Sequence, residues 1–195
     1  MSRIMKDRII VKFFILLNRF YFRLKSIEYG NSLMVMGLMK LDVRGKLLIG
    51  DNLNIISGQM FNPLGRNLKT CIRVEKNALI IIGNNVGASC VSIWSKEKII
   101  IGNNVKLGAN VMVFDSDMHS LDFKLRRNVS TDGVNAKSSP IVIGDDVFVG
   151  ANSIITKGVI IGEKSIIATG SVVVKSIPKN EIWGGNPAKF IKKIS

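Results

Sequence analysis

The chain has 195 residues, enough for one domain and too few for two of ordinary size. Hydrophobic residues make up 47% and charged residues 22%, with 18 Gly and 4 Pro, which excludes a disordered or collagen-like chain. Lys and Arg number 28 against 14 Asp and Glu, and this net charge of +14 favours anionic partners. Because zinc-finger spacing, RNP-like aromatics and a basic heptad helix are all missing from the sequence, we expect no nucleic-acid partner.

The two cysteines suggest neither a disulfide nor a metal site. Cys71 and Cys90 lie far from each other in sequence and from the single histidine. We therefore expect small core side chains in a reducing cytosol, a cytoplasmic protein and no bound metal.

Residues 1–25 combine a short apolar run with many Lys and Arg residues. The segment is too short and too charged to span a bilayer, and no small-residue cleavage site follows it. Two interpretations remain open. The helix lies on an anionic membrane, at its inner face, or it packs on its own domain or a neighbouring subunit, which is the commoner case. We expect residues 1–48 to form an N-terminal amphipathic and basic extension.

A six-residue period dominates the rest of the chain. An α-helix with 3.6 residues per turn cannot keep such a period on one face, whereas short strands joined by tight corners can. The period predicts a three-sided parallel β-helix over residues 49–178. Its clearest run of aliphatic positions is Ile143, Val149, Ile155, Ile161, Ile167 and Val173.

The period disappears in residues 114–140, FDSDMHSLDFKLRRNVSTDGVNAKSSP. This polar and charged segment is flanked by regular repeats, so it predicts an extruded loop of the kind that often carries function. His119, the only histidine of the chain, lies in it among Asp115, Asp117 and Asp122.

The repeats, the His119 loop, the run PIVIGDDVFVGANSIITKGVIIG and the ending GGNPAKFIKKI together resemble the hexapeptide-repeat acetyltransferases. The likeness covers roughly residues 80–195 and is nearest to bacterial polysaccharide and sugar O-acetyltransferases, with kinship to maltose and galactoside acetyltransferases. It implies an all-β, left-handed parallel β-helix and a homotrimer. It also implies acetyl-CoA as acyl donor in the groove between subunits, and a sugar or glycan acceptor. Residues 179–195 are expected to form a basic C-terminal tail or helix.

By this resemblance His119 is the general base that takes the proton of the acceptor hydroxyl, a task that suits neutral imidazole. Asp117 is expected to contact either the acceptor or the histidine. Asp115 and Arg127 are candidate acceptor contacts. For the three charged neighbours of His119, a solvated acidic loop with an exposed arginine remains the alternative.

The resemblance also marks a set of coenzyme-binding residues. The backbone N–H of Ala151 is expected to face the thioester oxygen, and Lys189 and Lys192 the coenzyme phosphates, although ordinary surface lysines remain the alternative. Phe148 stands where relatives often have Trp, and Val174 where some have Thr. The full set is Phe148, Gly150, Ala151, Thr169, Val174, Lys175, Lys189 and Lys192.

The histidine count excludes one rival function. A γ-class carbonic anhydrase needs three zinc-binding histidines, which this chain lacks. A non-catalytic β-helix, and acetyl transfer to an amino sugar, an antibiotic or serine, remain open.

Overall fold

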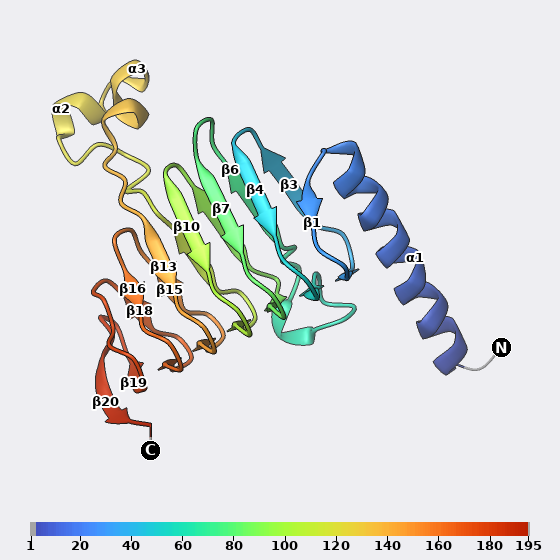
Figure 1. Ribbon diagram of the computed structural model, residues 1–195. Helices are drawn as coiled ribbons and strands as arrows, with labels where there is room; N and C mark the ends of the chain where they lie inside the picture. Colours follow the sequence, from blue (N-terminus) through green and yellow to red (C-terminus); the bar gives the residue numbers. More distant parts are fainter. Residues whose placement is uncertain (1–2, 195) are drawn as a thin grey trace.

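The computed structural model describes residues 3–194, with the side chains of the first helix described from residue 8 (Figure 1). Three sheets, parallel except for the last strand of one of them, form the walls of a β-helix, and each turn of the chain adds one strand to each wall. Sheet A contains β1 (Glu28–Tyr29), β4 (Lys46–Ile49), β7 (Leu79–Ile82), β10 (Lys98–Ile101), β13 (Ile141–Ile143) and β16 (Ile160–Ile161). Sheet B contains β2 (Leu33–Met36), β5 (Leu53–Ile56), β8 (Gly87–Ser89), β11 (Lys106–Leu107), β14 (Phe148–Val149), β17 (Ile166–Ile167), β19 (Glu181–Gly184) and β20 (Lys189–Lys193). Sheet C contains β3 (Lys40–Val43), β6 (Cys71–Val74), β9 (Ser92–Ser95), β12 (Met112–Phe114), β15 (Ile154–Ile155) and β18 (Val172–Val173).

The six-residue period corresponds to the stacked core of the β-helix. All six aliphatic positions from Ile143 to Val173 are at most 1% exposed. The strands pair in register between coils, so that Ile99 of β10 lies between Ile80 of β7 and Ile141 of β13. The sequence-based prediction of a parallel β-helix is confirmed, and the hand of the helix is left-handed.

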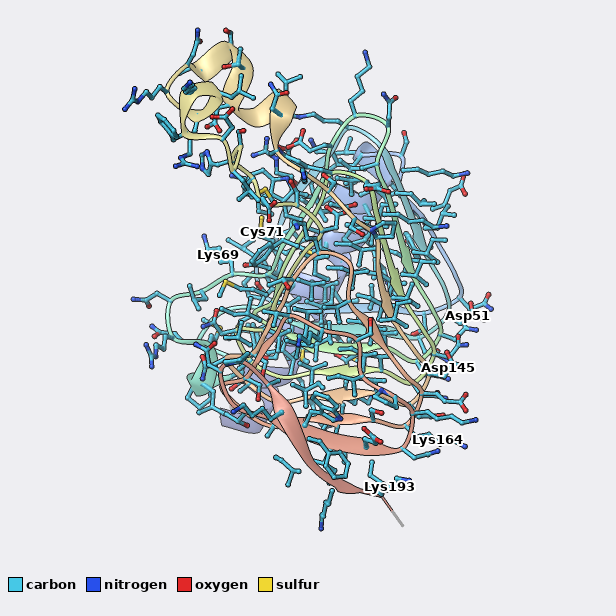
Figure 2. All side chains as sticks on the ribbon, turned by 90° about the vertical axis from the view of Figure 1, so that its left-hand side faces the viewer. Asp51, Lys69, Cys71, Asp145, Lys164 and Lys193 are labelled. Atoms are coloured by element: carbon cyan, nitrogen blue, oxygen red, sulfur yellow. The ribbon has the colours of Figure 1, made fainter. Side chains whose placement is uncertain are left out.

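The corners between sheets A and B are held by a ladder of side-chain amides and carboxylates. Asn84 Oδ1 accepts from the N–H of Asp51 at 2.7 Å, and Asp145 Oδ1 accepts from the N–H of Asn103 at the same distance. This backbone hydrogen bond, together with one from the Asn103 side chain, lowers the pKa of Asp145. Figure 2 shows Asp51, Asp145 and Lys164 along this edge. The Gly-Asn-Asn segments at 83–85 and 102–104 and the Gly-Asp-Asp segment at 144–146 therefore form these corners.

The β-helix begins earlier than the expected boundary at residue 49. Strands β1 to β3 pair in parallel with β4 to β6, so residues 28–43 already form a coil. The long turn at residues 57–70, between β5 and β6, interrupts the six-residue spacing, so the first coil is not recognised from the regular repeats that follow.

The C-terminal segment is a hairpin and not a helix. Strand β20 runs antiparallel to β19, with Trp183 and Phe190 packed edge to face at 6.4 Å between ring centroids. Its sequence, KFIKK, carries three lysines and all five residues are exposed, which suits an edge strand at the end of sheet B.

The helix α1 (Arg3–Leu24) packs against the first coil. Phe22 is fully buried and meets the Tyr29 ring edge to face, while Asn18 Nδ2 donates to the carbonyl oxygens of Val35 and Gly37 at 3.2 and 2.9 Å. One face of the helix is thus part of the domain. Within residues 3–194, no helix has the length and apolar character needed to cross a membrane.

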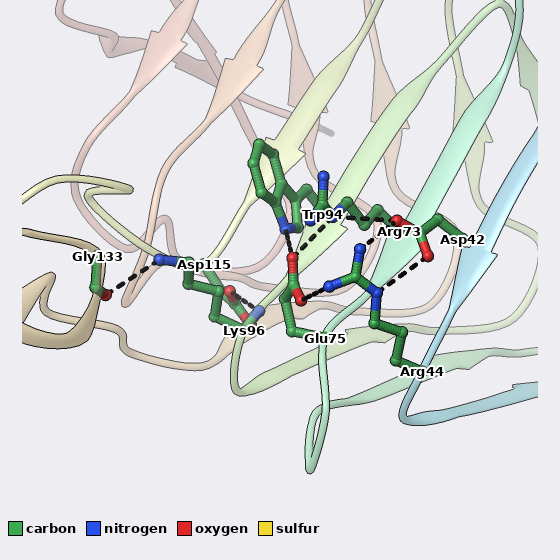
Figure 3. A network of polar contacts seen from close by, with 8 residues as sticks. All are labelled: Asp42, Arg44, Arg73, Glu75, Trp94, Lys96, Asp115 and Gly133. Carbon is green, nitrogen blue, oxygen red and sulfur yellow. Dashed lines mark hydrogen bonds and ion pairs between the residues drawn. The ribbon is translucent and has the colours of Figure 1, made fainter. Parts of the chain in front are cut away.

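A charged network covers the outer face of sheet C at its N-terminal end (Figure 3). Arg73 Nε lies 2.7 Å from Glu75 Oε1, and the guanidinium lies 4.5 Å from the centroid of the Trp94 ring. Arg44 hydrogen-bonds Asp42 and so lowers the pKa of this carboxyl. Exposed ion pairs contribute little to stability, so the stability of the domain rests mainly on the apolar stack.

Candidate active site

The loop of residues 115–140 leaves sheet C after β12 and returns to sheet A at β13. It contains the short helices α2 (Phe123–Arg126) and α3 (Val129–Asp132) and the 3₁₀ turn η2 (Gly133–Asn135). Figure 1 shows this lobe projecting from the stack, as the break in the repeat predicted.

Asp115 anchors the base of the loop. Its side chain is fully buried, and Oδ2 accepts from Ser95 Oγ and the Lys98 N–H, each at 2.7 Å, and from the Glu97 N–H at 3.0 Å. Oδ1 accepts from the Lys96 N–H at 2.7 Å. Both oxygens are therefore occupied by the preceding corner. The prediction that Asp115 contacts the acceptor is wrong, because the side chain turns into the stack and not into the loop.

His119 pairs with an aspartate that the sequence did not single out. Its Nδ1 lies 2.6 Å from Asp132 Oδ2, and Asp132 Oδ1 accepts from the Ser120 N–H at 2.8 Å. These two hydrogen bonds, that from His119 foremost, lower the pKa of Asp132. An ionised carboxylate accepts only, so Nδ1 is the nitrogen that carries the proton, and in the neutral imidazole Nε2 has a free lone pair. The His119 side chain is 69% exposed, which leaves Nε2 open to a reactant.

The loop is braced by arginine and by helix caps. Arg126 donates to the carbonyl oxygen of Ser120 at 2.6 Å, next to His119. Asp122 caps α2 by accepting from the Lys124 N–H at 2.8 Å. Arg127 is exposed and stacks on Phe123 at 5.0 Å. Arg126 therefore holds the backbone that carries the histidine, while Arg127 remains available to an acceptor.

Asp117 does not contact His119. Its Oδ1 lies 3.3 Å from Lys157 Nζ, and its Oδ2 is buried without a hydrogen-bond partner in the described part of the chain. The sequence led us to expect that Asp117 contacts either the acceptor or the histidine. The contact with the histidine is made by Asp132 instead. A hydrogen-bond donor at Oδ2 would offset the cost of leaving this buried oxygen unpaired.

Four of the expected coenzyme residues meet at the corner between sheets B and C. Phe148 is half exposed on the outer face of β14, and Gly150 and Ala151 form the corner that follows. A Cβ on Gly150 would lie 2.5 Å from the amide nitrogen of Thr169 in the next coil, so only glycine fits. In the described structure, the N–H of Ala151 donates to no backbone carbonyl. An amide N–H without a backbone acceptor is a candidate donor to a thioester carbonyl.

The other expected coenzyme residues lie elsewhere in the chain. Val174 and Lys175 follow β18 and are exposed at the corner between sheets C and A. Lys189 and Lys192 are exposed on β20 at the C-terminal end of sheet B. The loop of His119 also leaves from the corner between sheets C and A. The structure therefore divides the expected residues between two corners and the final hairpin.

Comparisons with known proteins agree with this architecture. Residues 72–114 and 140–175 match the family described as "Hexapeptide repeat of succinyl-transferase". A Schizosaccharomyces pombe protein named as an acetyltransferase is 47% identical over 117 residues, 60% of this chain and 44% of that protein. A 2,3,4,5-tetrahydropyridine-2,6-dicarboxylate N-acetyltransferase of Clostridium perfringens is 48% identical over 56 residues, 29% of this chain and 24% of that enzyme. The chain thus spans less than half the length of these curated relatives.

Two solved structures share the β-helix. A hexapeptide-repeat acetyltransferase of Vibrio cholerae complexed with acetyl coenzyme A is 29% identical, with a TM-score of 0.52 over 66% of this chain and 69% of that one. A maltose O-acetyltransferase of Clostridium difficile is also 29% identical, with a TM-score of 0.54 over 85% of this chain and 68% of that one. The family match covers less than half of this chain, so these comparisons show that the chain has hexapeptide repeats and shares the left-handed β-helix of these acetyltransferases.

Proposed function

We propose that this protein is an acetyl-CoA-dependent O-acetyltransferase that acts on a hydroxyl of a sugar or glycan precursor. The observation that carries the proposal is the exposed His119 with its Nδ1 fixed on Asp132. The similarity to a maltose O-acetyltransferase and to an acetyl-CoA complex supports the acceptor class and the donor.

The proposed reaction begins with proton transfer from the acceptor hydroxyl to Nε2 of His119. The hydroxyl oxygen attacks the thioester carbonyl carbon, and the N–H of Ala151 hydrogen-bonds the oxyanion that develops. When the C–S bond breaks, the imidazolium returns its proton to the leaving thiolate. Asp132 stabilises the positive charge that the ring carries between these two transfers.

The division of the expected residues supports a site shared between subunits. The loop that carries His119 leaves the stack at the corner between sheets C and A, whereas Phe148 and Ala151 lie at the corner between sheets B and C. We propose that a homotrimer brings the His119 loop of one subunit to the Ala151 corner of its neighbour. In the same assembly, Lys189 and Lys192 on the exposed β20 would contact the coenzyme phosphates.

An assay of thioester consumption with purified protein tests the function. The acceptors are maltose, galactosides, glycan fragments, an amino sugar, serine and chloramphenicol. We expect acetyl esters of a sugar, which mild alkali cleaves. Products that resist alkali would be amides and would favour N-acetyl transfer. This second candidate function is suggested by the similarity to the N-acetyltransferase of Clostridium perfringens. Absence of acetyl transfer to every acceptor would contradict the proposal.

Changing Asp132 to Asn should lower kcat by roughly tenfold to a thousandfold. The amide keeps the shape of the side chain but no longer holds a negative charge opposite the imidazolium, and it can fix the wrong ring tautomer. Steady-state kinetics should show this loss in kcat with little change in the KM for acetyl-CoA. Asp122→Asn is the matched control, because Asp122 caps α2 in the same loop and does not touch His119. Equal activity of Asp132→Asn and wild type would exclude the positioning role.

Changing both Lys189 and Lys192 to Ala should raise the KM for acetyl-CoA severalfold and flatten its salt dependence, with kcat nearly unchanged. Loss of charge that binds the ground state and the transition state equally has this kinetic signature. The Lys46→Ala, Lys76→Ala variant removes the same charge from exposed positions in the early coils and serves as control. If both double variants have the same KM, the phosphate contact is ruled out.

A further inference from the structure

The helix α1 carries a second apolar face that the β-helix does not cover. Asn18 and Phe22 are buried against the first coil, whereas six large apolar side chains elsewhere on the helix, counted from residue 8 onward, are between 37% and 66% exposed. These are Ile9, Phe13, Leu16, Leu17, Phe20 and Leu24.

The exposed apolar residues form one continuous stripe. At about 100° per residue they fall within an arc of roughly 100°, on the side of the helix opposite Asn18 and Phe22. Leu38, 48% exposed in the turn after β2, extends the stripe. Together with Leu17, Phe20 and Leu24 it lines a shallow, mainly apolar hollow of about 320 Å³. An exposed apolar surface of this kind indicates an interaction site.

A row of basic residues runs beside the stripe. Arg8, Lys12, Arg19 and Arg23 are exposed and occupy an arc of roughly 60° between the buried face and the apolar stripe. Asp7 is the one acidic residue in the sequence of α1. The helix thus presents an apolar stripe with positive charge along its edge.

We propose that α1 lies flat on an anionic lipid surface, with the apolar stripe inserted among the acyl chains and the basic row on the lipid phosphates. An interfacial helix needs this combination of features. A second copy of α1 is a poor occupant, because the two basic rows would be brought close together.

The position of α1 in the fold suits this role. Figure 1 shows the helix at the N-terminal end of the stack, beside β1 and far from the β19–β20 hairpin. The loop of His119 lies farther along the stack and does not cover α1. If three parallel subunits assemble, three such helices face the same way, and their binding adds by multivalency. The inference does not depend on the reaction that the protein catalyses.

Vesicle co-sedimentation of the full chain tests the proposal. Wild type should bind vesicles of phosphatidylcholine and phosphatidylserine at least tenfold more tightly than vesicles of phosphatidylcholine alone. Phe13→Gln with Phe20→Gln should weaken that binding at least tenfold. Lys12→Gln with Arg23→Gln should weaken it and reduce its salt dependence. Val129→Gln with Val134→Gln changes two highly exposed residues of the projecting lobe and should bind like wild type.

Sedimentation equilibrium and circular dichroism of each variant distinguish lipid binding from assembly and from misfolding. We expect all four proteins to keep the same mass and fold. Failure of wild type to bind phosphatidylserine vesicles would overturn the proposal, as would undiminished binding by the Phe13, Phe20 variant. A lower mass of that variant in the absence of lipid would identify a second copy as the occupant and would also overturn it. If the Phe13, Phe20 variant unfolds, Leu16→Gln alone takes its place in the binding test. Met60→Gln with Leu64→Gln, which changes two exposed residues of another loop, then serves as a second fold control.

Discussion

Replacing His119 with Ala should lower kcat by about 100- to 10,000-fold, the range expected for loss of a general base. His119 is the only histidine of the chain, and Asp132 fixes the ring so that Nε2 is free to accept a proton. Its side chain is mostly exposed and contributes little to packing, so the fold should remain intact. The measurement is steady-state kinetics with a competent acceptor, next to calorimetric binding of acetyl-CoA.

Two observations would separate loss of the base from loss of structure. Binding of acetyl-CoA and the sedimentation mass should match those of wild type. His119→Asn should be as inactive as His119→Ala, because an amide can hydrogen-bond a hydroxyl but cannot take its proton near neutral pH. A His119→Ala enzyme that keeps more than about half of its kcat would refute the mechanism.

The repeat could be predicted from the sequence because each coil imposes the same demand on its residues. An inward side chain every sixth residue must be aliphatic, and the run from Ile143 to Val173 satisfies this without a gap. The first coil, residues 28–43, escaped this prediction. A long turn separates β5 from β6, and no regular spacing survives across such an insertion.

The candidate site was predictable only in part. A polar break in the repeat identified the loop, and a single histidine within it identified the base. The partner of that base was not predictable by proximity in sequence, because Asp132 lies thirteen residues beyond His119 and reaches it through the fold of α2 and α3. Proximity in sequence to His119 also led to the wrong role for Asp115, because its side chain points into the corner that it anchors and not toward an acceptor.

Replacing Asp115 with Ala should destabilise the protein by about 3 kcal/mol, which corresponds to a fall in the unfolding midpoint of roughly 6 to 12 °C. Three backbone N–H groups and the hydroxyl of Ser95 would lose their acceptor, and the site is fully buried. Asp115→Asn should act in the same direction. Its amide offers one oxygen, and its NH₂ group would face donors instead of acceptors.

The position of Asp115 makes this loss both structural and functional. The carbonyl oxygen of the same residue accepts from the Ser139 N–H at 2.9 Å, which ties the start of the loop to its end, and this backbone hydrogen bond depends on the position in which the side chain holds Asp115. Asp122→Ala is the control, since it removes an exposed carboxylate that caps only α2 and should cost no more than about 1 kcal/mol. Thermal unfolding followed by circular dichroism measures the difference. If Asp115→Ala unfolds within a degree or two of Asp122→Ala, Asp115 does not anchor the loop, and the projection of His119 must depend on the contacts of Arg126 and Asp132 alone.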